Sequence, residues 1–579
     1  MKSITVKRQT TYMKNINKKI LIIFLSLTLI LSVFGCGTDN TQTTDTASVP
    51  QSGTASENGQ TEDPEDVSRE ADGQFLLTGG SYETSGNTYT ITSAGEYTLR
   101  GRLEEGLIVV DASDEDEVVL NLDNVYISSS SGAAITVLGA DEVKIKSSDG
   151  SYNTVRDLRS GDDSDEEYDG AIWSDCDLKL SGSGILIVST DYTNGIKSKN
   201  DLEIKDVTLK VTSSGTALKG NDSVSLESGN VLLISTGDEG IVTRDSDISS
   251  KGNQRGDITV ISARLTIYSA SDGIKASHDV IIGQDEGDPE ILIFTADLSP
   301  YTVSSMKNVS SMAIKAEGTI SVFSGRITAQ SSGDCLHAAS GVTLGNGTVS
   351  EGDIILSGGE LVLQSGDDAI HADGSVTLSG AIVTVPSSHE GVEANVINIS
   401  SGSLVAVATD DGLNATSGSL ATAINISGGY VDVTVTGSDV DAIDSNGDIN
   451  VSGGTVIAKC TSSVNGMAGN FDCDGTFTVT GGTVIGIGGI CKIPGSDTVR
   501  VYISDSLGLD EGSYLLRSSD GTLIAEFDLD MSFTSFWTAS DMIIRGGSYS
   551  LSREDISVIS WEQTEDTTGD YGLSGPGRQ

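Results

Sequence analysis

The sequence predicts an all-β fold, a single-stranded parallel β-helix of about 12 or more coils with a small C-terminal β cap. Three observations lead to this expectation. A short motif recurs through the chain, the segments between motifs alternate apolar and polar residues, and glycine is abundant (69 of 579 residues) while proline is scarce (7). Repeats at a short fixed period are typical of stacked structures, and scarce proline leaves backbone amides free to pair in ladders.

Each coil is marked by a small residue followed by an aliphatic one, and many intervals between these markers are 21 to 24 residues. Longer intervals hold polar insertions, near 250, at 283–310 and at 341–353. A propeller blade would need roughly 40 to 50 residues. The markers are Ala171-Ile172, Gly195-Ile196, Ala217-Leu218, Gly240-Ile241, Gly273-Ile274, Ala313-Ile314, Cys335-Leu336, Ala369-Ile370, Gly391-Val392, Gly412-Leu413, Ala442-Ile443 and Gly466-Met467.

Within a coil, two short alternating strands flank a Ser-Gly-Gly turn, as in Asp448–Ala458 and Asp353–Leu363. Alternation indicates residues that point in and out of a strand, and the enrichment in β-branched residues favours strands over helix. One coil cannot bury its inner face alone, whereas stacking buries a continuous column of Ile, Val and Leu.

The composition suggests five segments: a signal peptide with a lipobox at 1–36, a disordered spacer at 37–71, the β-helix at 72–497, a C-terminal β cap at 498–560 and a disordered tail at 561–579. The apolar run from Ile20 to Phe34 follows three lysines and is shorter than the roughly 20 residues of a membrane-spanning helix. Its end at Cys36 resembles a bacterial lipobox. We expect an extracellular protein anchored to the cell membrane by lipidated Cys36; a plain signal peptide or an uncleaved anchor is the alternative.

The formal net charge of −49 disfavours nucleic acid as a partner, because phosphate contacts need clustered Lys and Arg. It also disfavours direct contact with anionic lipid, so the lipid anchor is the expected membrane contact. We expect a monomer. Five cysteines follow Cys36, with no spacing typical of metal ligands. We expect buried thiols and leave open one disulfide among Cys460, Cys473 and Cys491.

An acidic column lies two residues before the aliphatic residue of each marker. In stacked coils, equivalent positions lie about 4.8 Å apart, so adjacent carboxylates repel by roughly 3 kcal/mol at a dielectric constant near 20. The column contains five successive acids, Asp334, Asp368, Glu390, Asp411 and Asp441. Such a row needs solvent screening, raised pKa values, neighbouring cations or bound metal.

The residue after each marker decides which of these applies. Upstream coils carry Lys197, Lys219, Lys275 and Lys315 there, whereas from about Asp367 to Asp444 acids are expected to stack without a basic partner. Oxygen ligands without cations suit Ca²⁺. A solvated ladder of Asp-Gly turns is the alternative. The expected Ca²⁺ ligands are Asp367, Asp368, Asp410, Asp411, Asp441 and Asp444, together with Asp334, Glu390 and Glu393.

Three segments, 171–180, 194–202 and 441–447, resemble the bacterial cellulose- and polygalacturonate-binding parallel β-helix family. The resemblance runs from about residue 75 to about 550. It implies a right-handed helix, Ca²⁺ on acidic turns and similarity to family 9 pectate lyases. Altered turns at Thr216-Ala217-Leu218 and Met312-Ala313-Ile314 depart from the family pattern.

The resulting hypothesis is a surface protein that binds polysaccharide through a Ca²⁺-loaded coil face, without a catalytic residue. One alternative is a Ca²⁺-dependent polysaccharide lyase with a neutral lysine as base, for which Lys459 is the first candidate and Lys275 and Lys315 follow. Another is a non-catalytic adhesin. Trp537 is either a sugar-stacking platform or part of a terminal core.

Overall fold

The computed structural model describes residues 71–160, 168–296, 300, 310–341, 343, 347–416, 421–461, 469–489, 492–495, 500–504, 507–554 and 556–563. The described residues all belong to one compact unit, Val67–Gln579. The predicted lipobox with Cys36, nearly all of the predicted spacer and residues 564–579 lie outside the described residues. Among the residues that are described, no helix is long and apolar enough to cross a membrane.

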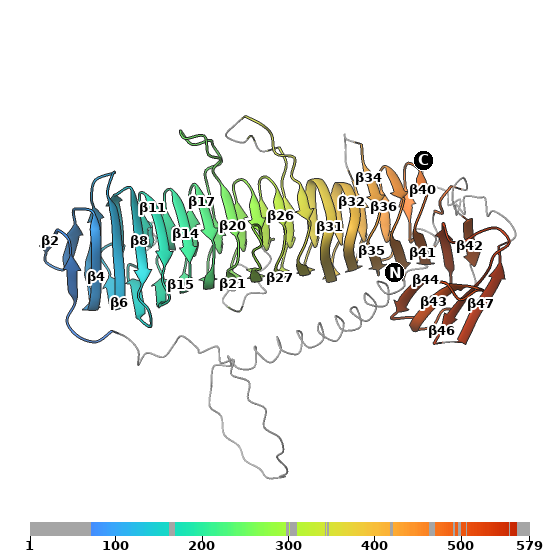
Figure 1. Ribbon diagram of the computed structural model, residues 1–579, viewed down its shortest axis with the longest axis horizontal. Helices are drawn as coiled ribbons and strands as arrows, with labels where there is room; N and C mark the ends of the chain where they lie inside the picture. Colours follow the sequence, from blue (N-terminus) through green and yellow to red (C-terminus); the bar gives the residue numbers. More distant parts are fainter. Residues whose placement is uncertain are drawn as a thin grey trace, which may run out of the picture. The chain divides into compact units, whose positions relative to one another are not determined.

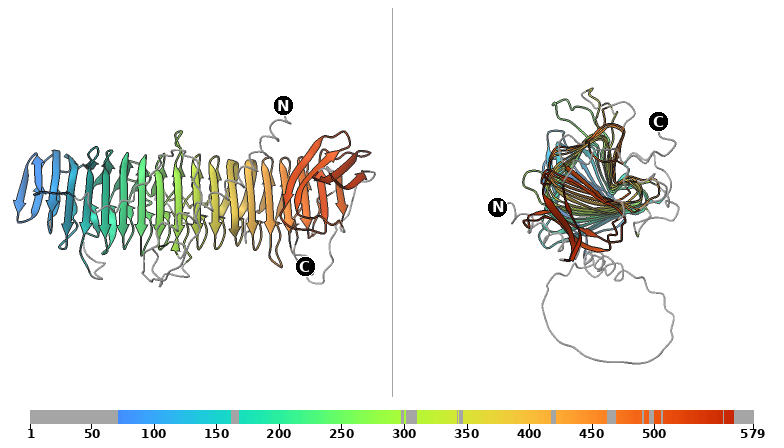
Figure 2. Two further views of the ribbon diagram at one scale, coloured as in Figure 1. Left: turned by 90° about the horizontal axis from the view of Figure 1, so that it is seen from below. Right: turned by 90° about the vertical axis from the view of Figure 1, so that its right-hand side faces the viewer.

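The described residues form an all-β fold, dominated by one large sheet of mostly parallel strands. Strands pair in steps of three: β10 (Gly170–Ser174), β11 (Asp177–Ser181) and β12 (Ile185–Thr190) pair with the next three strands, β13 (Asn194–Ser198), β14 (Asp201–Lys205) and β15 (Val207–Ser213). We call each such set of three strands a rung. Figures 1 and 2 show successive rungs side by side in chain order.

The first strand of most rungs contains the aliphatic residue of the marker. In many rungs this strand has only three residues. A strand of that length shows no alternating pattern in the sequence. The prediction of two strands per coil is therefore wrong, because each rung contains three. These strands are β5 (Leu107–Asp111), β7 (Ile135–Gly139), β10, β13, β16 (Leu218–Gly220), β19 (Ile241–Val242), β22 (Ile274–Ala276), β25 (Ile314–Ala316), β28 (Leu336–Ala338), the starts of β31 (Ile370–Ser388) and β32 (Val392–Ala408), β33 (Leu413–Ala415), β36 (Ile443–Ser445) and β39 (Asp472–Cys473).

The second strand of each rung precedes the Gly-rich turn. Its members are β4 (Gly95–Leu103), β6 (Glu117–Ser129), β8 (Glu142–Ser147), β11, β14, β17 (Ser223–Leu226), β20 (Asp257–Val260), β23 (Val280–Ile282), β26 (Ile320–Val322), β29 (Ile354–Leu356), the middles of β31 and β32, β34 (Ala423–Ile426), β37 (Asp448–Val451) and β40 (Phe477–Val479).

The third strand of each rung runs from that turn towards the acidic turn. Its members are β9 (Tyr152–Asp157), β12, β15, β18 (Gly229–Ser235), β21 (Arg264–Ser269), β24 (Glu290–Thr295), β27 (Arg326–Ser331), β30 (Glu360–Ser365), the ends of β31 and β32, β35 (Tyr430–Val435), β38 (Thr455–Cys460) and β41 (Thr483–Gly488).

The aliphatic marker residues form one buried column, as the comparison of the repeats within the sequence predicts. Ile172 pairs with Ile196, and the same register continues without a break to Leu413 and Ile443. Each of these side chains is at most 1% exposed. The stretch before residue 157 joins the same stack, because β5 pairs in parallel with β7. An antiparallel pair, β2 (Tyr82–Ser85) with β3 (Thr88–Ile91), and β1 (Leu76–Gly79) on β4 precede it.

One predicted marker is wrong. Asp444 pairs with Asp472, which makes Phe471 the partner of Ile443 and places Asn470 where the small residue stands in other rungs. The predicted marker, Gly466-Met467, lies outside the described residues. An amide and an aromatic ring replace the small-aliphatic pair in this rung, so the sequence pattern could not locate it.

The C-terminal region contains two further parts. β42 (Arg500–Ser504) and β45 (Phe536–Ser540) extend the large sheet by antiparallel pairing beside β41. A separate antiparallel sheet holds β44 (Leu523–Leu529), β43 (Gly512–Ser518), β46 (Ser548–Arg553) and β47 (Ile556–Glu562) in that order. Its apolar face packs on Ile457, Ile485 and Ile487 of the last rungs. Strand β47 continues two residues past the predicted boundary at 560.

Trp537 belongs to this terminal core. Its side chain is fully buried against the stacked rings of Phe471 and Phe477, and its indole Nε1 donates to Asn470 Oδ1 at 3.1 Å. The prediction of core packing is confirmed, and the sugar-stacking platform is wrong. Cys176, Cys335, Cys460 and Cys473 are buried, and no disulfide joins any two of these described cysteines; Cys491 lies outside the described residues.

Candidate functional site

The acidic turns stack as the sequence predicts. The backbone N–H of Asp368 donates to Asp334 Oδ1 at 3.0 Å, and the N–H of Asp441 donates to Asp411 Oδ1 at 2.7 Å. Each of these carboxylates therefore accepts the amide of its counterpart in the next rung. We call this series the acid row: Asn194, Thr216, Glu239, Asp272, Met312, Asp334, Asp368, Glu390, Asp411 and Asp441.

A second row runs beside it on the first strands of the rungs, one residue after the markers. Strand register fixes its members as neighbours, and its chemistry changes along the stack from ammonium through imidazole to carboxylate. We call it the adjacent row: Trp173, Lys197, Lys219, Val242, Lys275, Lys315, His337, His371, Glu393, Asn414, Asp444 and Asp472.

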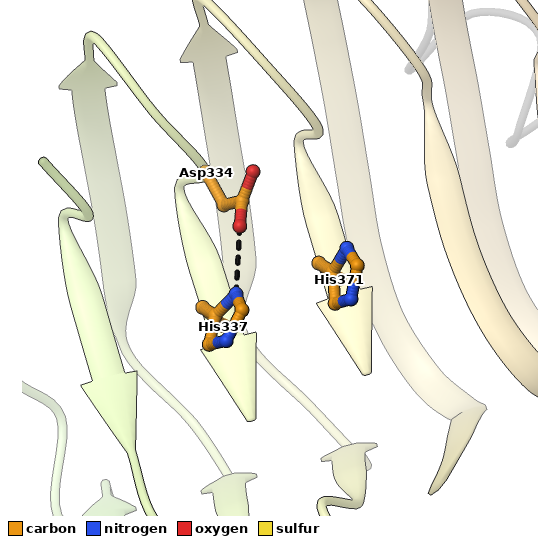
Figure 3. Close-up of side chains that lie close together, drawn as sticks. All are labelled: Asp334, His337 and His371. Atoms are coloured by element: carbon orange, nitrogen blue, oxygen red, sulfur yellow. Dashed lines mark hydrogen bonds and ion pairs between the residues drawn. The ribbon is translucent and has the colours of Figure 1, made fainter. Parts of the chain in front are cut away.

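The two histidines of the adjacent row pair with the predicted metal ligands. His337 Nδ1 lies 2.7 Å from Asp334 Oδ2, as Figure 3 shows, and the rings of His337 and His371 stack with their centroids 4.9 Å apart. His371 Nδ1 lies 2.9 Å from Asp368 Oδ2 and 3.1 Å from Glu393 Oε2. The prediction that acids from Asp367 to Asp444 have no basic partner is therefore wrong for Asp368 and Glu393.

These contacts shift the pKa values of the buried groups in opposite directions. Burial raises the pKa of Asp368 to about 6, whereas the hydrogen bond from His371 lowers the pKa of Glu393. Burial disfavours the imidazolium of His371, but its bonds to both carboxylates outweigh that effect and raise its pKa to about 11. The cluster thus holds a positively charged imidazole between two acids.

Among the acid-row residues near His371, Glu390 has the most strongly raised pKa. Burial, followed by the charges of Asp368 and Glu393, raises it to about 8. Asn414 Nδ2 donates to both Glu390 oxygens, at 3.3 and 3.1 Å. At neutral pH this carboxyl is largely protonated, so its rung carries less negative charge than the sequence suggests.

The nine predicted ligands divide into three groups. Asp334, Asp368 and Glu393 contact the stacked histidines. Asp367, Glu390 and Asp410 surround the exposed His389, whose Nε2 lies 3.6 Å from Asp410 Oδ2. The third group, Asp411, Asp441 and Asp444, continues to Asp472 and offers oxygen ligands alone. The sequence alignment missed Asp472 because that rung's marker was misplaced.

The oxygen-only group offers the ligand type that Ca²⁺ prefers. Hard oxygen ligands suit this ion, which takes six to eight of them, and Asp411, Asp441, Asp444 and Asp472 lie on three consecutive rungs. Asp441 is only 5% exposed. The His-paired group fits Ca²⁺ less well, because imidazole nitrogens favour transition metals.

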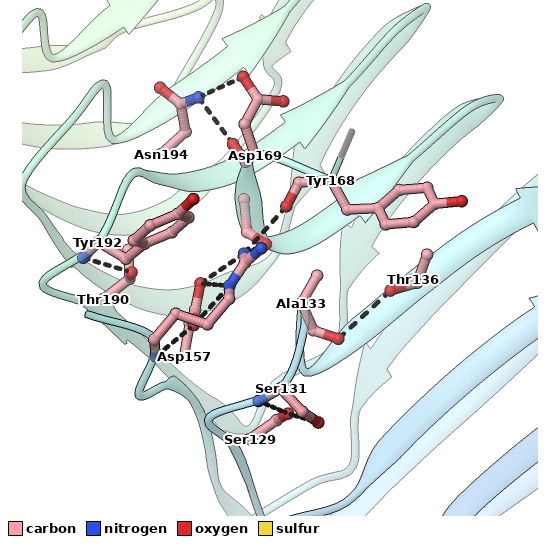
Figure 4. A network of polar contacts seen from close by, with 12 residues as sticks. Ser129, Ser131, Ala133, Thr136, Asp157, Tyr168, Asp169, Thr190, Tyr192 and Asn194 are labelled. Atoms are coloured by element: carbon pink, nitrogen blue, oxygen red, sulfur yellow. Dashed lines mark hydrogen bonds and ion pairs between the residues drawn. The ribbon is translucent and has the colours of Figure 1, made fainter. Parts of the chain in front are cut away.

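Upstream rungs combine acids and cations, as expected. Lys197 Nζ lies 2.5 Å from Asp169 Oδ1, and Lys275 lies 3.3 Å from Glu239. The same region holds a buried pair, Arg159 with Asp157, whose Nη2–Oδ2 distance is 2.7 Å. Figure 4 shows Asp157 and Asp169 within this polar network.

The lysines proposed as bases have different surroundings. Lys459 Nζ lies 2.5 Å from Asp432 Oδ1, and the residue is 7% exposed, so the first candidate base is a buried ion-pair partner. Asp272 and Glu239 hold the pKa of Lys275 above its usual value, although burial alone lowers it. Lys315 lies 3.6 Å from Glu317. Among the described lysines, Lys219 is the one with a lowered pKa, caused first by burial and then by Lys197 and Arg244.

A different polar surface follows the second strands. Asn425 Nδ2 donates to Asn398 Oδ1 at 3.0 Å, Asn450 Nδ2 donates to Asn425 Oδ1 at 3.1 Å, and Thr478 Oγ1 donates to Asn450 Oδ1 at 2.9 Å. Thr377 precedes them in register. These half-buried side chains alternate with core residues and therefore line the outer face. We call Asn398, Asn425 and Asn450 the amide row.

These features define an all-β repeat protein whose rungs carry rows of mostly ionisable side chains and, separately, a row of uncharged amides. Residues 85–353, less than half of the chain, match the family model described as "Carbohydrate-binding domain-containing protein". A protein of that description from Acetivibrio thermocellus is 34% identical over 125 residues, which are 21% of this chain and 44% of that relative.

One solved structure is also similar to this chain. It is the polysaccharide lyase-like protein from C. thermocellum, as its gadolinium derivative, at 22% identity over 55% of this chain and 89% of that chain. The TM-score is 0.25, so this likeness carries no argument about function. The present chain spans less than half the length of its Acetivibrio relative.

Proposed function

We propose that this protein binds polysaccharide of the cellulose or polygalacturonate type outside the cell. The match of residues 85–353 to a carbohydrate-binding family model carries this proposal. In it, the stack of rungs is a right-handed parallel β-helix, the polysaccharide lies along its outer surface, and the chain is a monomer held at the membrane by lipidated Cys36.

The amide row supports the binding of a hydroxyl-rich ligand. Carboxamides carry both donors and acceptors, and sugar hydroxyls need both. The row repeats at the strand spacing of about 4.8 Å, so a linear glycan could make the same contact on successive rungs. It also lacks charge, which lets a protein of net charge −49 approach a neutral chain without electrostatic cost.

Calcium extends the proposal to acidic glycans. In this proposal Ca²⁺ binds to Asp411, Asp441, Asp444 and Asp472 and bridges them to uronate carboxylates. Two negatively charged surfaces repel each other without such an ion. The oxygen-only chemistry of this group supports the choice of ion.

Affinity electrophoresis and pull-down on cellulose and polygalacturonate test the two surfaces separately. The double variant Asn398→Ala/Asn425→Ala should bind cellulose at least tenfold more weakly, with or without chelator. Ser225→Ala, which removes a polar group from the same register further upstream, serves as the matched control. Polygalacturonate retention should fall in chelator and in Asp444→Asn. If wild-type protein is retained on neither glycan, the binding proposal is wrong and the adhesin alternative gains support.

The anchor has its own test. Cells given a labelled fatty acid should incorporate the label into wild-type protein, and Cys36→Ser should remove the label and release the protein from the membrane fraction. Label that persists in Cys36→Ser would contradict lipidation at this residue.

Lys219 keeps a second function, the Ca²⁺-dependent lyase, under consideration. A lysine base must be neutral. The lowered pKa of Lys219 favours its neutral form, and no other described lysine has a lowered pKa. Incubation with polygalacturonate and Ca²⁺ should then raise the ultraviolet absorbance of unsaturated uronates, and Lys219→Met should abolish the rise. A wild-type protein that produces no rise excludes the lyase.

A further inference from the structure

We propose that Asp368, His371 and Glu393 form a binding site for a divalent transition-metal ion of the zinc type, separate from the Ca²⁺ group. The full sequence contains four histidines, and two of them occupy neighbouring rungs of one row. One imidazole nitrogen with two carboxylate oxygens is a ligand set that suits Zn²⁺ and similar ions.

The three ligand atoms already converge. His371 Nδ1 is 2.9 Å from Asp368 Oδ2 and 3.1 Å from Glu393 Oε2, and one ligand atom from each residue lies within 4.8 Å of the others. Tetrahedral bonds of about 2.0–2.2 Å place ligand atoms roughly 3.3–3.6 Å apart. Replacing the shared proton with a metal ion therefore needs side-chain movements of only about half an ångström.

The remaining nitrogen of His371 is oriented for this role. His371 Nε2 lies 3.4 Å from Asp373 Oδ1. A carboxylate on the outer nitrogen of a metal-binding histidine favours the tautomer that leaves the inner nitrogen free to bind, and such partners are typical of zinc sites. Asp373 also accepts the N–H of Ser340 at 2.8 Å, which fixes its position.

Rigid elements hold the ligands. His371 and Glu393 are register partners on β31 and β32. Asp368 is 5% exposed, and its backbone N–H is bound to Asp334. A site on strands, with a buried ligand held by its neighbours, needs little reorganisation when an ion binds. The half-buried Glu393 leaves access from the surface.

Cobalt absorption spectroscopy and zinc calorimetry on the purified, chelator-treated protein test the site. Wild-type protein should bind one Co²⁺ with visible d–d bands, and Zn²⁺ should displace it while millimolar Ca²⁺ should not. His371→Gln and Glu393→Gln should each weaken Zn²⁺ binding at least tenfold. His337→Gln, which removes the stacked imidazole of the adjoining rung, should keep the cobalt spectrum, as should Asp444→Asn in the Ca²⁺ group.

X-ray absorption fine structure at the zinc edge tests the site in the wild-type protein, so it does not depend on variants that fold poorly. It should show a single imidazole among oxygen ligands. An oxygen-only shell, equal displacement by Ca²⁺, or full binding by a folded His371→Gln protein would each overturn the proposal. None of these results bears on glycan retention, so this site and the proposed function stand or fall separately.

Discussion

Lys459 Nζ lies 2.5 Å from Asp432 Oδ1, and the two residues are 7% and 8% exposed. Tyr430 donates its hydroxyl to Asp432 Oδ2 at 3.2 Å, and Lys459 also donates to the carbonyl oxygen of Asp528 in β44, at 3.5 Å. This buried pair therefore lies where the last rungs meet the C-terminal sheet, and it connects the two.

Removing only the Lys459 cation should lower the free energy of unfolding. Lys459→Met leaves the Asp432 carboxylate buried without its partner, for which about 3–5 kcal/mol of destabilisation is typical. Urea unfolding should show this loss, whereas the double change Lys459→Met/Asp432→Leu should recover most of it. Any lyase activity should remain in the folded fraction. A single variant as stable as wild type would contradict the buried pair.

Core packing should limit the size of the small residue of each marker. A Cβ atom added at Gly412 would lie 2.0 Å from Val433 Cγ1 and 2.5 Å from the carbonyl oxygen of Ala442. Gly412→Ala should therefore destabilise the stack by about 1–3 kcal/mol through overpacking. In the same column, the reverse change Ala442→Gly should cost only about 0.5–1 kcal/mol. Thermal unfolding of both variants measures the difference, and equal melting temperatures would refute the packing argument.

His278 should make stability depend on pH. Its Nδ1 lies 2.5 Å from Asp257 Oδ1, and this hydrogen bond raises the pKa of His278 above 6.5. A raised folded-state pKa contributes stability that is full below the unfolded-state value and is lost as pH rises through the folded-state value. The neighbouring Asp279, whose pKa burial raises, acts in the same direction.

Melting temperatures of wild type and His278→Gln test this dependence. Wild type should exceed the variant most at pH 5.5, and the gap should narrow as pH rises past 7. Sulfate-free buffers of matched ionic strength keep other charges equally screened. A gap that widens with pH would show that the pair does not act in this way.

Calcium removal should lower the stability of the downstream rungs. An ion that binds only the folded state adds about 2.7 kcal/mol when its concentration is 100 times the dissociation constant. Millimolar Ca²⁺ should therefore raise the melting temperature over that in chelator, and Asp444→Asn should remove most of the increase. Glu115→Gln removes an exposed acid far upstream and should leave the increase intact. An increase that survives in Asp444→Asn would place the ion elsewhere.

The sequence was sufficient for much of the fold. Aliphatic residues such as Ile196 and Leu413 can be buried only if the repeats stack, so a shared marker sets the strand register along the whole column. The same register brings Asp334 to Asp368 and Asp411 to Asp441, which is why the acid row could be predicted. The exceptions, the three-residue first strands and the Asn470-Phe471 marker, have too little pattern to detect.

The pairing of charges required the tertiary structure. His371 meets Glu393 from the next rung and Lys459 meets Asp528 from another sheet, 69 residues away. Whether an acid is compensated depends on which side chains burial and strand register bring within about 4 Å, because electrostatic energies change steeply with distance and solvent access. The sequence by itself determined the stack and its rows; only the folded structure decided that His337 and His371 compensate Asp334, Asp368 and Glu393 and that Lys459 is a buried structural cation.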